Sequence, residues 1–166
     1  MDAPGPDEVD TLVDAWRRER GDLDLAPVEV FSRIGRLARH LDQARRDAFT
    51  AARVESWEFD VLAALRRAGR PYQLSPGALL RETLVTSGTM TNRVDRLAGR
   101  GLVERLPDPR DRRGVLVRLT PEGRTTVDRA FEALLEAEQT FLAELPDKDR
   151  TRLAGLLRTL LAPFAG

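Results

Sequence analysis

Cysteine is absent from this chain, and histidine occurs once, at position 40. Without cysteine the protein has no disulfides, no thiolate metal sites and no cysteine-based redox sensor. A single histidine is also too few for a transition-metal sensor, and we expect no metal and no cofactor. His40 falls on an apolar-striped helix, where it is either a partly buried interface residue or a group that senses pH near neutrality.

Long apolar runs are missing as well, since no stretch approaches the roughly 18 residues that span a bilayer. The N-terminal residues are acidic and lack an apolar segment, unlike a secretory leader. We therefore expect a cytoplasmic protein without a membrane partner. No glycine-rich phosphate loop, nucleophile elbow or paired-metal spacing is present, and Ser87-Gly88 is better explained as a helix start. These absences argue against an enzyme, and no catalytic residue is assigned.

Charge is distributed unevenly, although the formal net charge is zero. Residues 1–32 carry nine acids and three arginines, whereas residues 70–118 carry ten arginines and five acids, a net charge of +5. A locally basic segment in a neutral protein is typical of a nucleic-acid-binding module.

The stretch from 86 to 100 predicts a helix with two unlike faces. Thr86 or Ser87 caps its start, and Gly99 and Gly101 end it. At about 100° per residue, one face is apolar. It holds Met90, Val94, Leu97 and Ala98. The opposite, polar face carries Gly88, Asn92, Asp95, Arg96 and Gly99, with Thr89 and Arg100 beside it.

A basic hairpin is predicted to follow this helix. Residues 102–106 and 115–119 are rich in branched side chains and predict two short strands, joined by a loop over 107–114. That loop holds three arginines and two prolines and is expected at the surface. A polar helix fits the major groove of DNA, and hairpin arginines reach phosphates or the minor groove.

The helix offers several candidate DNA contacts. Asn92 suits adenine, and Arg96 suits guanine or a phosphate, although one sequence does not decide between these. A merely solvated helix face is the alternative. The full set on this helix is Ser87, Thr89, Thr91, Asn92 and Arg96.

These motifs, in this order, resemble the MarR (multiple-antibiotic-resistance regulator) family of winged-helix transcription factors, over roughly 28–164. The resemblance implies that Asp111 helps to position a groove-facing Arg113, with Arg110 and Arg112 as further phosphate contacts, although a mobile solvated arginine is the alternative for each. Ser75, before the preceding helix, is a further DNA-contact candidate. The matching segments are Leu74-Ser75-Pro76, Thr86 to Arg93, Asp95-Arg96-Leu97, Gly101-Leu102-Val103, Asp108 to Arg113 and Leu119 to Gly123.

The chain is expected to be mainly helical with a small β-wing. We predict an extra N-terminal helix within 1–27, a dimerisation region from 28–55 with 121–166, and a winged helix-turn-helix over 56–120. Further helices are expected over 7–20, 28–52, from Ser56 to Gly69, 75–82, from Thr120 to Leu145 and 147–161. Their surplus of apolar residues predicts a two-fold homodimer and an inverted-repeat operator, with half-sites about 34 Å apart.

A urate-responsive subgroup of the family resembles the chain further. It has a tryptophan in an extra N-terminal helix, an aspartate before the helix-turn-helix and two arginines, and Trp16, Asp60, Arg93 and Arg105 match them. The resemblance implies that a planar anion binds here, and Asp60 is expected to hold either arginine without ligand. The alternatives are a core or interface tryptophan, a helix-end aspartate and arginines that contact phosphate.

The sequence thus predicts a dimeric DNA-binding regulator, expected to be a repressor released by a small anionic or aromatic ligand such as urate. Another aromatic acid or an antibiotic-like compound is an alternative effector. The alternative function is a ligand-independent architectural or dimerisation protein, whose DNA affinity would depend on salt but not on sequence.

Overall fold

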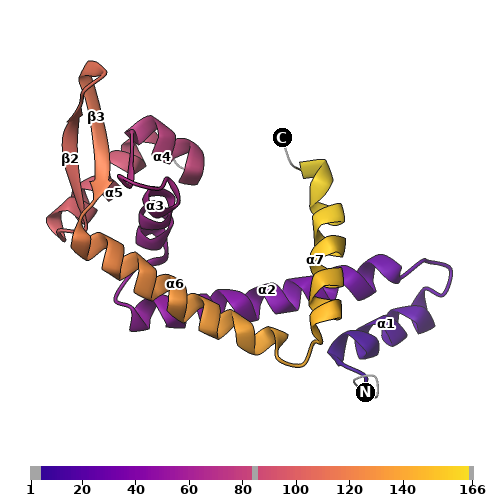
Figure 1. Ribbon diagram of the computed structural model, residues 1–166. Coiled ribbons are helices and arrows are strands. Elements are labelled where there is room, and N and C mark those ends of the chain that lie inside the picture. Colours follow the sequence, from indigo (N-terminus) through magenta and orange to yellow (C-terminus); the bar gives the residue numbers. More distant parts are fainter. Residues whose placement is uncertain (1–4, 84–85, 165–166) are drawn as a thin grey trace. The chain divides into compact units, whose positions relative to one another are not determined.

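The computed structural model describes residues 5–83 and 86–164. The chain forms two compact units, Met1–Gln43 and Ala44–Gly166. Figure 1 traces their helices and strands along the chain. Helices predominate, and the strands of the described part form one small antiparallel sheet. The predicted fold class, mainly helical with a small β-wing, is confirmed.

The first unit contains α1 (Glu8–Glu19) and most of α2 (Ala26–Ala51), which continues into the second unit. Asp7 caps α1, because its carboxylate accepts the amides of Val9 and Asp10 at 2.7 and 3.1 Å. The apolar cluster of this unit is small, so it buries little surface from water. It consists of Val9, Val13 and Leu25, with Val28 packed against them.

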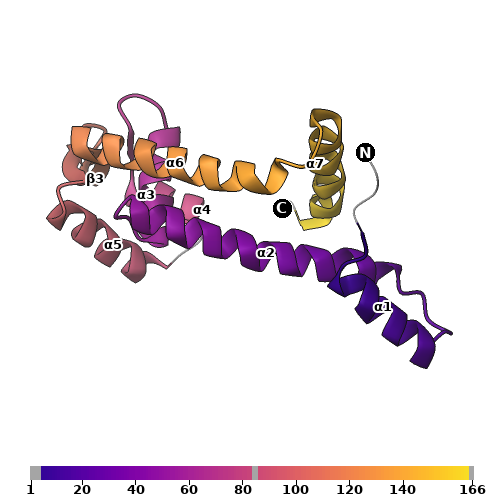
Figure 2. The same cartoon turned by 90° about the horizontal axis from the view of Figure 1, so that it is seen from below.

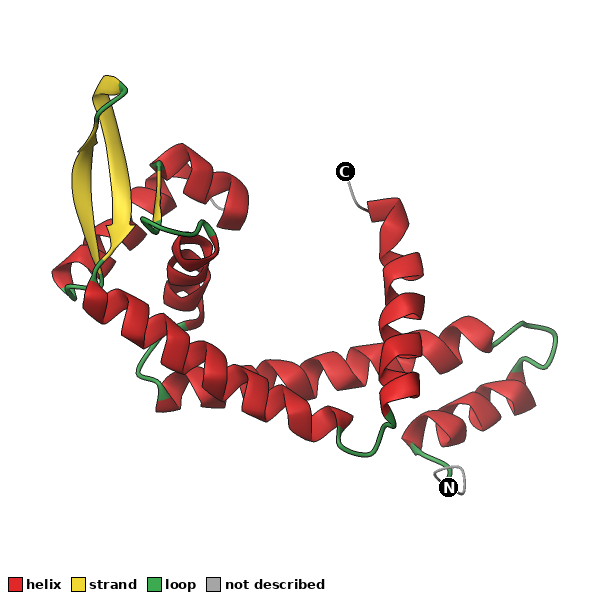
Figure 3. Cartoon of the chain, viewed as in Figure 1, coloured by secondary structure: helices red, strands yellow, loops and turns green. Residues whose placement is uncertain are grey.

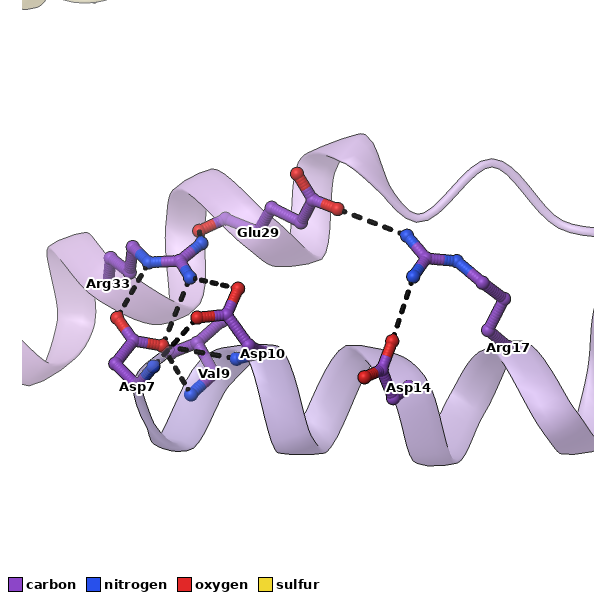
Figure 4. A network of polar contacts seen from close by, with 7 residues as sticks. All are labelled: Asp7, Val9, Asp10, Asp14, Arg17, Glu29 and Arg33. Carbon is purple, nitrogen blue, oxygen red and sulfur yellow. Dashed lines mark hydrogen bonds and ion pairs between the residues drawn. The ribbon is translucent and has the colours of Figure 1, made fainter. Parts of the chain in front are cut away.

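Ion pairs supplement this small cluster by joining α1 to α2 (Figure 4). Arg33 of α2 contacts Asp7 at 2.8 Å and Asp10 at 2.7 Å, and Arg17 of α1 contacts Glu29 at 3.3 Å. The hydrogen bond from Arg33 lowers the pKa of Asp7 to about 2. These pairs are solvent-exposed, so salt screens them and each contributes little by itself.

The second unit is built on α3 (Ser56–Arg67), α4 (Pro76–Thr83) and α5 (Ser87–Gly99). Figure 2 shows these three helices grouped together, with α4 and α5 as the two helices of the predicted helix-turn-helix. The side chains of α3 expected inside are buried. The largest buried residues of this core are Phe49, Leu62, Leu65, Leu79, Met90 and Leu97.

A three-stranded antiparallel sheet completes this core, in the order β1-β3-β2. Strands β2 (Val103–Asp108) and β3 (Asp111–Leu119) form the hairpin, and β1 (Gln73–Leu74) pairs with the other edge of β3. Figure 3 shows the hairpin as two long arrows that extend past the neighbouring helices. The two-residue strand β1 was not predicted, because so short a segment carries no alternating pattern.

The predicted eight-residue loop over 107–114 is wrong. The ladder continues from Pro107 opposite Val115 to Asp108 opposite Asp111, with one irregularity between Pro107 and Asp108. Proline is tolerated here because β2 is an edge strand, where a missing N–H breaks no central ladder. Asp108 accepts the amide of Arg110 at 2.9 Å, which closes the tip tightly.

Helix α5 ends at Gly99, and only the second of the two predicted stop glycines has the stop conformation. Gly99 is still helical, and the left-handed residue is Gly101, with φ of 69°. Its amide donates to the carbonyl of Ala98 at 2.9 Å, and that of Leu102 donates to Leu97 at 3.0 Å. This paired arrangement is the Schellman motif. Ala98 itself is exposed, contrary to its expected place on the apolar face.

Helix α3 begins at Ser56 as predicted, but Ser56 does not cap it. Glu55 is the N-cap residue, and its amide donates to the carboxylate of Glu58 at 3.0 Å. A carboxylate three residues into a helix can accept the amide of the N-cap residue, as Glu58 does here. Its negative charge is also favourable near the positive end of the helix dipole.

Two helices follow the sheet within the second unit. Helix α6 (Pro121–Leu142) starts at Thr120, whose hydroxyl accepts the amide of Gly123 at 3.0 Å. Helix α7 (Asp147–Leu161) has the predicted bounds, and a short 3₁₀ turn η1 (Ala162–Phe164) follows it. Pro146 separates α6 from α7, as expected from its missing N–H.

Neither a membrane-spanning helix nor a cluster of metal ligands occurs within residues 5–83 and 86–164. No helix in that part of the chain is long and apolar enough to cross a membrane. Among the same residues, no group of three or more histidine, aspartate or glutamate side chains is arranged to hold a metal ion.

Gly123 allows α6 to approach the sheet closely. A Cβ at this position would lie 1.9 Å from the carbonyl oxygen of Leu102. Since backbone rather than a flexible side chain is in the way, we expect Gly123→Ala to lower the free energy of unfolding by about 2–3 kcal/mol. Urea denaturation measures this. The control is Gly99→Ala, where a Cβ meets nothing within 4 Å; equal losses in both variants would contradict the close approach.

Candidate nucleic-acid interface

Helix α5 presents a polar face to solvent. Met90, Val94 and Leu97 are buried, which confirms the predicted apolar face. The side chains of α5 that are assigned to DNA are all exposed. Two hydroxyls are already engaged within the helix start: Thr89 with Thr86 at 2.9 Å, and Thr91 with the carbonyl of Ser87 at 3.2 Å. Apart from Arg96, the assigned side chains are short, so most of the exposed surface of α5 has little bulk. The assigned set is Ser87, Thr89, Thr91, Asn92 and Arg96.

Arg96 is held by two residues at the start of α3. Its Nη2 lies 2.8 Å from the carboxylate of Glu55, and its guanidinium lies 4.6 Å from the ring centre of Trp57. The indole Nε1 of Trp57 donates to the other oxygen of Glu55 at 2.6 Å. The same hydrogen bond is the main reason why the pKa of Glu55 is lowered, with Arg96 contributing. The three side chains therefore form a closed polar triangle.

Trp57 also borders a cleft on α5. Arg93 lies 5.5 Å from the ring centre of Trp57, on the flank of the helix. The cleft, about 470 Å³, has polar residues of α5 as its other wall. Trp57 was not predicted as a site residue. The sequence signal that could have identified it is a large aromatic residue that lies beside the apolar stripe of α3 rather than within it. The cleft is lined by Trp57, Gly88, Thr89, Asn92, Arg93 and Arg96.

A buried carboxylate ties the end of α5 to the start of α3. Glu58 is 1% exposed and forms an ion pair with Arg100, the C-cap residue of α5. Arg100 also donates to the carbonyl of Arg53 at 2.8 Å. A buried charge is costly unless it is paired and hydrogen-bonded, so this contact anchors the end of α5 to the start of α3. Sequence reasoning did not single out Glu58 or Arg100 as partners.

The hairpin tip carries exposed arginines on a backbone shaped by aspartates. Asp111 accepts the backbone amide of Arg113 at 2.9 Å, and Asp108 does the same for Arg110. The aspartate in the wing thus acts on the main chain of Arg113. The side chains of Arg110 and Arg113 are exposed. Arg112 is on β3, but its side chain lies outside the described residues, so its assignment stays a prediction.

Ser75 has a capping contact at the start of α4. Its hydroxyl accepts the amide of Ala78 at 3.2 Å, and Pro76 occupies the first helical position. The predicted helix start is confirmed, because both residue types suit a first helical turn. The DNA contact assigned to Ser75 stays a prediction.

The four residues assigned to an effector are paired differently from expectation. Asp60 was expected to hold Arg93 or Arg105, but it pairs with Arg45 of α2 at 3.3 Å. Arg105 pairs with Asp95 of α5 at 2.9 Å, and Arg93 lies over Trp57. Each arginine is instead engaged by a residue other than Asp60. The fourth residue, Trp16, belongs to the first unit and is exposed.

Two adjoining cavities flank α3 on the side of Asp60. One, about 290 Å³, has Asp60 and Arg45 among its polar walls. The other, about 360 Å³, lies between α3 and α6 and is mostly apolar, with Phe59, Val127 and Phe131 in its walls. Arg66 borders this second cavity and is paired with Asp128 at 2.8 Å, which raises the pKa of Arg66. An aromatic acid would find both apolar and cationic surface here.

The Glu58–Arg100 pair generates a stability prediction. Replacing Glu58 by Gln removes a buried charge and weakens the links to Arg100 and to the amide of Glu55. We expect Glu58→Gln to lower the free energy of unfolding by about 1–3 kcal/mol. The matched control is Glu82→Gln, which removes an exposed partner of Arg67 and should cost less than about 1 kcal/mol. Equal costs in urea denaturation would show that burial of Glu58 is not decisive.

Comparison with known proteins relates this chain to DNA-binding transcriptional regulators. A family model described as the MarR family matches residues 54–114, which span α3 to the middle of β3. The HTH-type transcriptional regulator PecS of Dickeya dadantii is 37% identical over 150 residues, which cover 90% of each chain.

Two solved structures are similar over most of the chain. A mutant of MarR from E. coli, complexed with operator DNA, superposes with a TM-score of 0.63 at 29% identity, covering 80% of this chain and 98% of that one. BpsR of Bordetella bronchiseptica, described with a mechanism for regulation of its DNA binding by 6-hydroxynicotinic acid, has a TM-score of 0.63 at 29% identity. That match covers 79% of this chain and 91% of BpsR.

Proposed function

The chain belongs to the MarR family of DNA-binding transcriptional regulators, and from this premise we propose that it is a homodimeric repressor of an inverted-repeat operator. The observation that carries the proposal is the exposed polar face of α5 beside a basic hairpin. In this proposal α5 enters the major groove, with Asn92 and Arg96 facing base edges. Arg110 and Arg113 of the hairpin contact phosphates or the minor groove.

Exposed apolar side chains support the homodimer. In the first unit Val30, Phe31, Ile34 and Leu37 are exposed on α2. Monomers rarely expose so many large apolar residues together, so a second copy is the expected cover. The second unit exposes a further set on α6 and α7, consisting of Phe131, Leu135, Leu156, Leu157, Leu160 and Leu161. A two-fold axis would then place two α5 helices about one DNA turn, roughly 34 Å, apart.

We further propose that a small planar aromatic anion, such as urate, releases the protein from DNA. Trp16, Asp60, Arg93 and Arg105 are the candidate contacts. Arg105 bonds to Asp95 on α5, so an anion that took Arg105 would compete with that link to the DNA-reading helix. BpsR, a relative, is regulated by 6-hydroxynicotinic acid, a heteroaromatic acid of the same chemical class. The ligand acts only if it prefers the form that does not bind DNA.

A ligand-independent architectural protein is the alternative. Phosphate contacts alone give an affinity that falls steeply with salt and is indifferent to sequence. The set of short polar side chains on α5 favours base reading over that alternative, because it leaves room for close approach to the groove.

Operator binding is tested by mobility shift on the DNA beside the gene, against scrambled DNA. We expect Arg96→Ala to weaken operator binding by about 5- to 150-fold and to relax the preference at one base pair. Arg113→Ala should weaken all sequences alike and reduce the slope of log affinity against log salt by about 1. Arg18→Ala, on α1, is the control. Equal affinity of the wild type for operator and scrambled DNA would favour the architectural alternative.

Effector binding is tested by thermal unfolding and by release of DNA, with urate and 6-hydroxynicotinic acid as probes. A ligand at 100 times its dissociation constant stabilises the folded protein by about 2.7 kcal/mol, so binding should raise the melting temperature clearly. We expect Trp16→Ala and Arg105→Ala each to reduce this rise. If neither probe alters melting or DNA affinity of the wild type, the proposed effector class is wrong and the DNA-binding function stands.

A further inference from the structure

We propose that Glu55 and Trp57 are positioning residues, which orient the Arg96 guanidinium for reading a base in the operator. The proposal rests on the proposed function, in which Arg96 faces DNA. Nothing in the local pattern of α5 requires this pair, since Glu55 lies 41 residues earlier in the chain.

The first argument is the geometry of the triangle. Each oxygen of the Glu55 carboxylate has its own partner: Oε1 accepts from Arg96 at 2.8 Å and Oε2 accepts from Trp57 at 2.6 Å. The indole therefore prevents the carboxylate from turning, while its ring lies 4.6 Å from the Arg96 guanidinium. Stacking and a hydrogen bond together restrict the plane and the direction of the guanidinium.

The second argument is what the triangle leaves open. The contact with Glu55 uses one of the two N–H groups of Arg96 Nη2. The other N–H of Nη2, together with that of Nε or Nη1, still offers a base edge two parallel donors. The Arg96 side chain is 53% exposed and lines the cleft with Asn92 and Thr89. Arginine reads guanine through two parallel donors, which requires a fixed orientation of its plane. An arginine that is already placed loses less rotamer freedom when it binds.

The third argument is that the triangle stands on a fixed base. Glu55 and Trp57 flank the first residue of α3, and Glu58 in the same turn is buried and paired with Arg100. Two links therefore join the first turn of α3 to the last turns of α5. The buried Glu58–Arg100 pair fixes the position of α5. The exposed Glu55–Arg96 pair orients the side chain that faces the groove in the proposed complex.

The experiment measures dissociation constants of the full-length protein for the operator, for operators with each base pair replaced in turn, and for scrambled DNA. The variants are Arg96→Ala, Glu55→Gln, Trp57→Phe and the double variant Glu55→Gln with Arg96→Ala. Trp57→Phe keeps an aromatic ring but removes the N–H that holds Glu55. Glu29→Gln, which removes a carboxylate from an exposed pair with Arg17, is the matched control for the loss of one negative charge.

We expect Glu55→Gln and Trp57→Phe each to weaken operator binding by about 3- to 10-fold, within the range of coupled neighbours. The loss should fall at the same base pair at which Arg96→Ala loses discrimination. Affinity for scrambled DNA and the melting temperature should match those of Glu29→Gln. In the Arg96→Ala background, Glu55→Gln should cause no further loss, because nothing is left to position.

Each of the following outcomes would overturn the proposal. Tighter operator binding by Glu55→Gln would mean that Glu55 withholds Arg96 from DNA. An equal loss for operator and scrambled DNA, or the same loss with and without Arg96, would make Glu55 a general structural residue. If Arg96→Ala keeps full discrimination, Arg96 reads no base and the assignment within the proposed function fails too. Loss in Arg96→Ala without loss in Glu55→Gln leaves the proposed function standing and removes only the positioning role.

Discussion

Glu58 carries a carboxylate into a nearly water-free position in the first turn of α3, where it is 1% exposed. Such a charge is tolerated only with close partners, and it has two: the amide of Glu55 and the guanidinium of Arg100. Because Arg100 is the C-cap of α5, the partner of this buried carboxylate also anchors the end of that helix to the start of α3. The buried face of α5, with Met90, Val94 and Leu97 in the core, then leaves only one face free.

The outer surface of the same junction has a different character. The Glu55–Trp57–Arg96 contacts are solvent-exposed, so they contribute little to stability and are free to serve binding. The buried Glu58–Arg100 pair and the exposed Glu55–Arg96 pair therefore have different roles. The first holds a helix and the second holds a side chain. This division explains how α5 can present short polar residues without losing its place in the fold.

Much of the fold followed from local pattern, whereas the site did not. The bounds of α7, the start of α6 at Thr120 and the two faces of α5 are set by proline, capping residues and a 3.6-residue period, all visible within about 20 residues. The hairpin was predicted too short, because Pro107 marks a turn in most contexts but is tolerated on an edge strand. The partners of Arg96, Arg100 and Asp60 lie 15 to 42 residues away along the chain. No periodicity encodes such pairs; only the packed fold selects among the many acids and arginines available.

Because the chain has many arginines, an exposed carboxylate can exchange one arginine partner for another. Such exchange is the means by which the proposed ligand would act. Arg105 is tied to Asp95 on α5, and Asp60 to Arg45 on α2. Each pair is exposed, so each is held weakly and a competing anion faces a small barrier. In the proposed mechanism, an anion that binds Arg105 frees Asp95, a negative charge on the helix that is proposed to contact DNA. The released carboxylate would then repel phosphate, so exchange of one partner alters DNA affinity without unfolding any helix. Under the proposed effector mechanism, the buried Glu58 link would keep α5 in place while the exposed pairs around it exchange partners with the ligand.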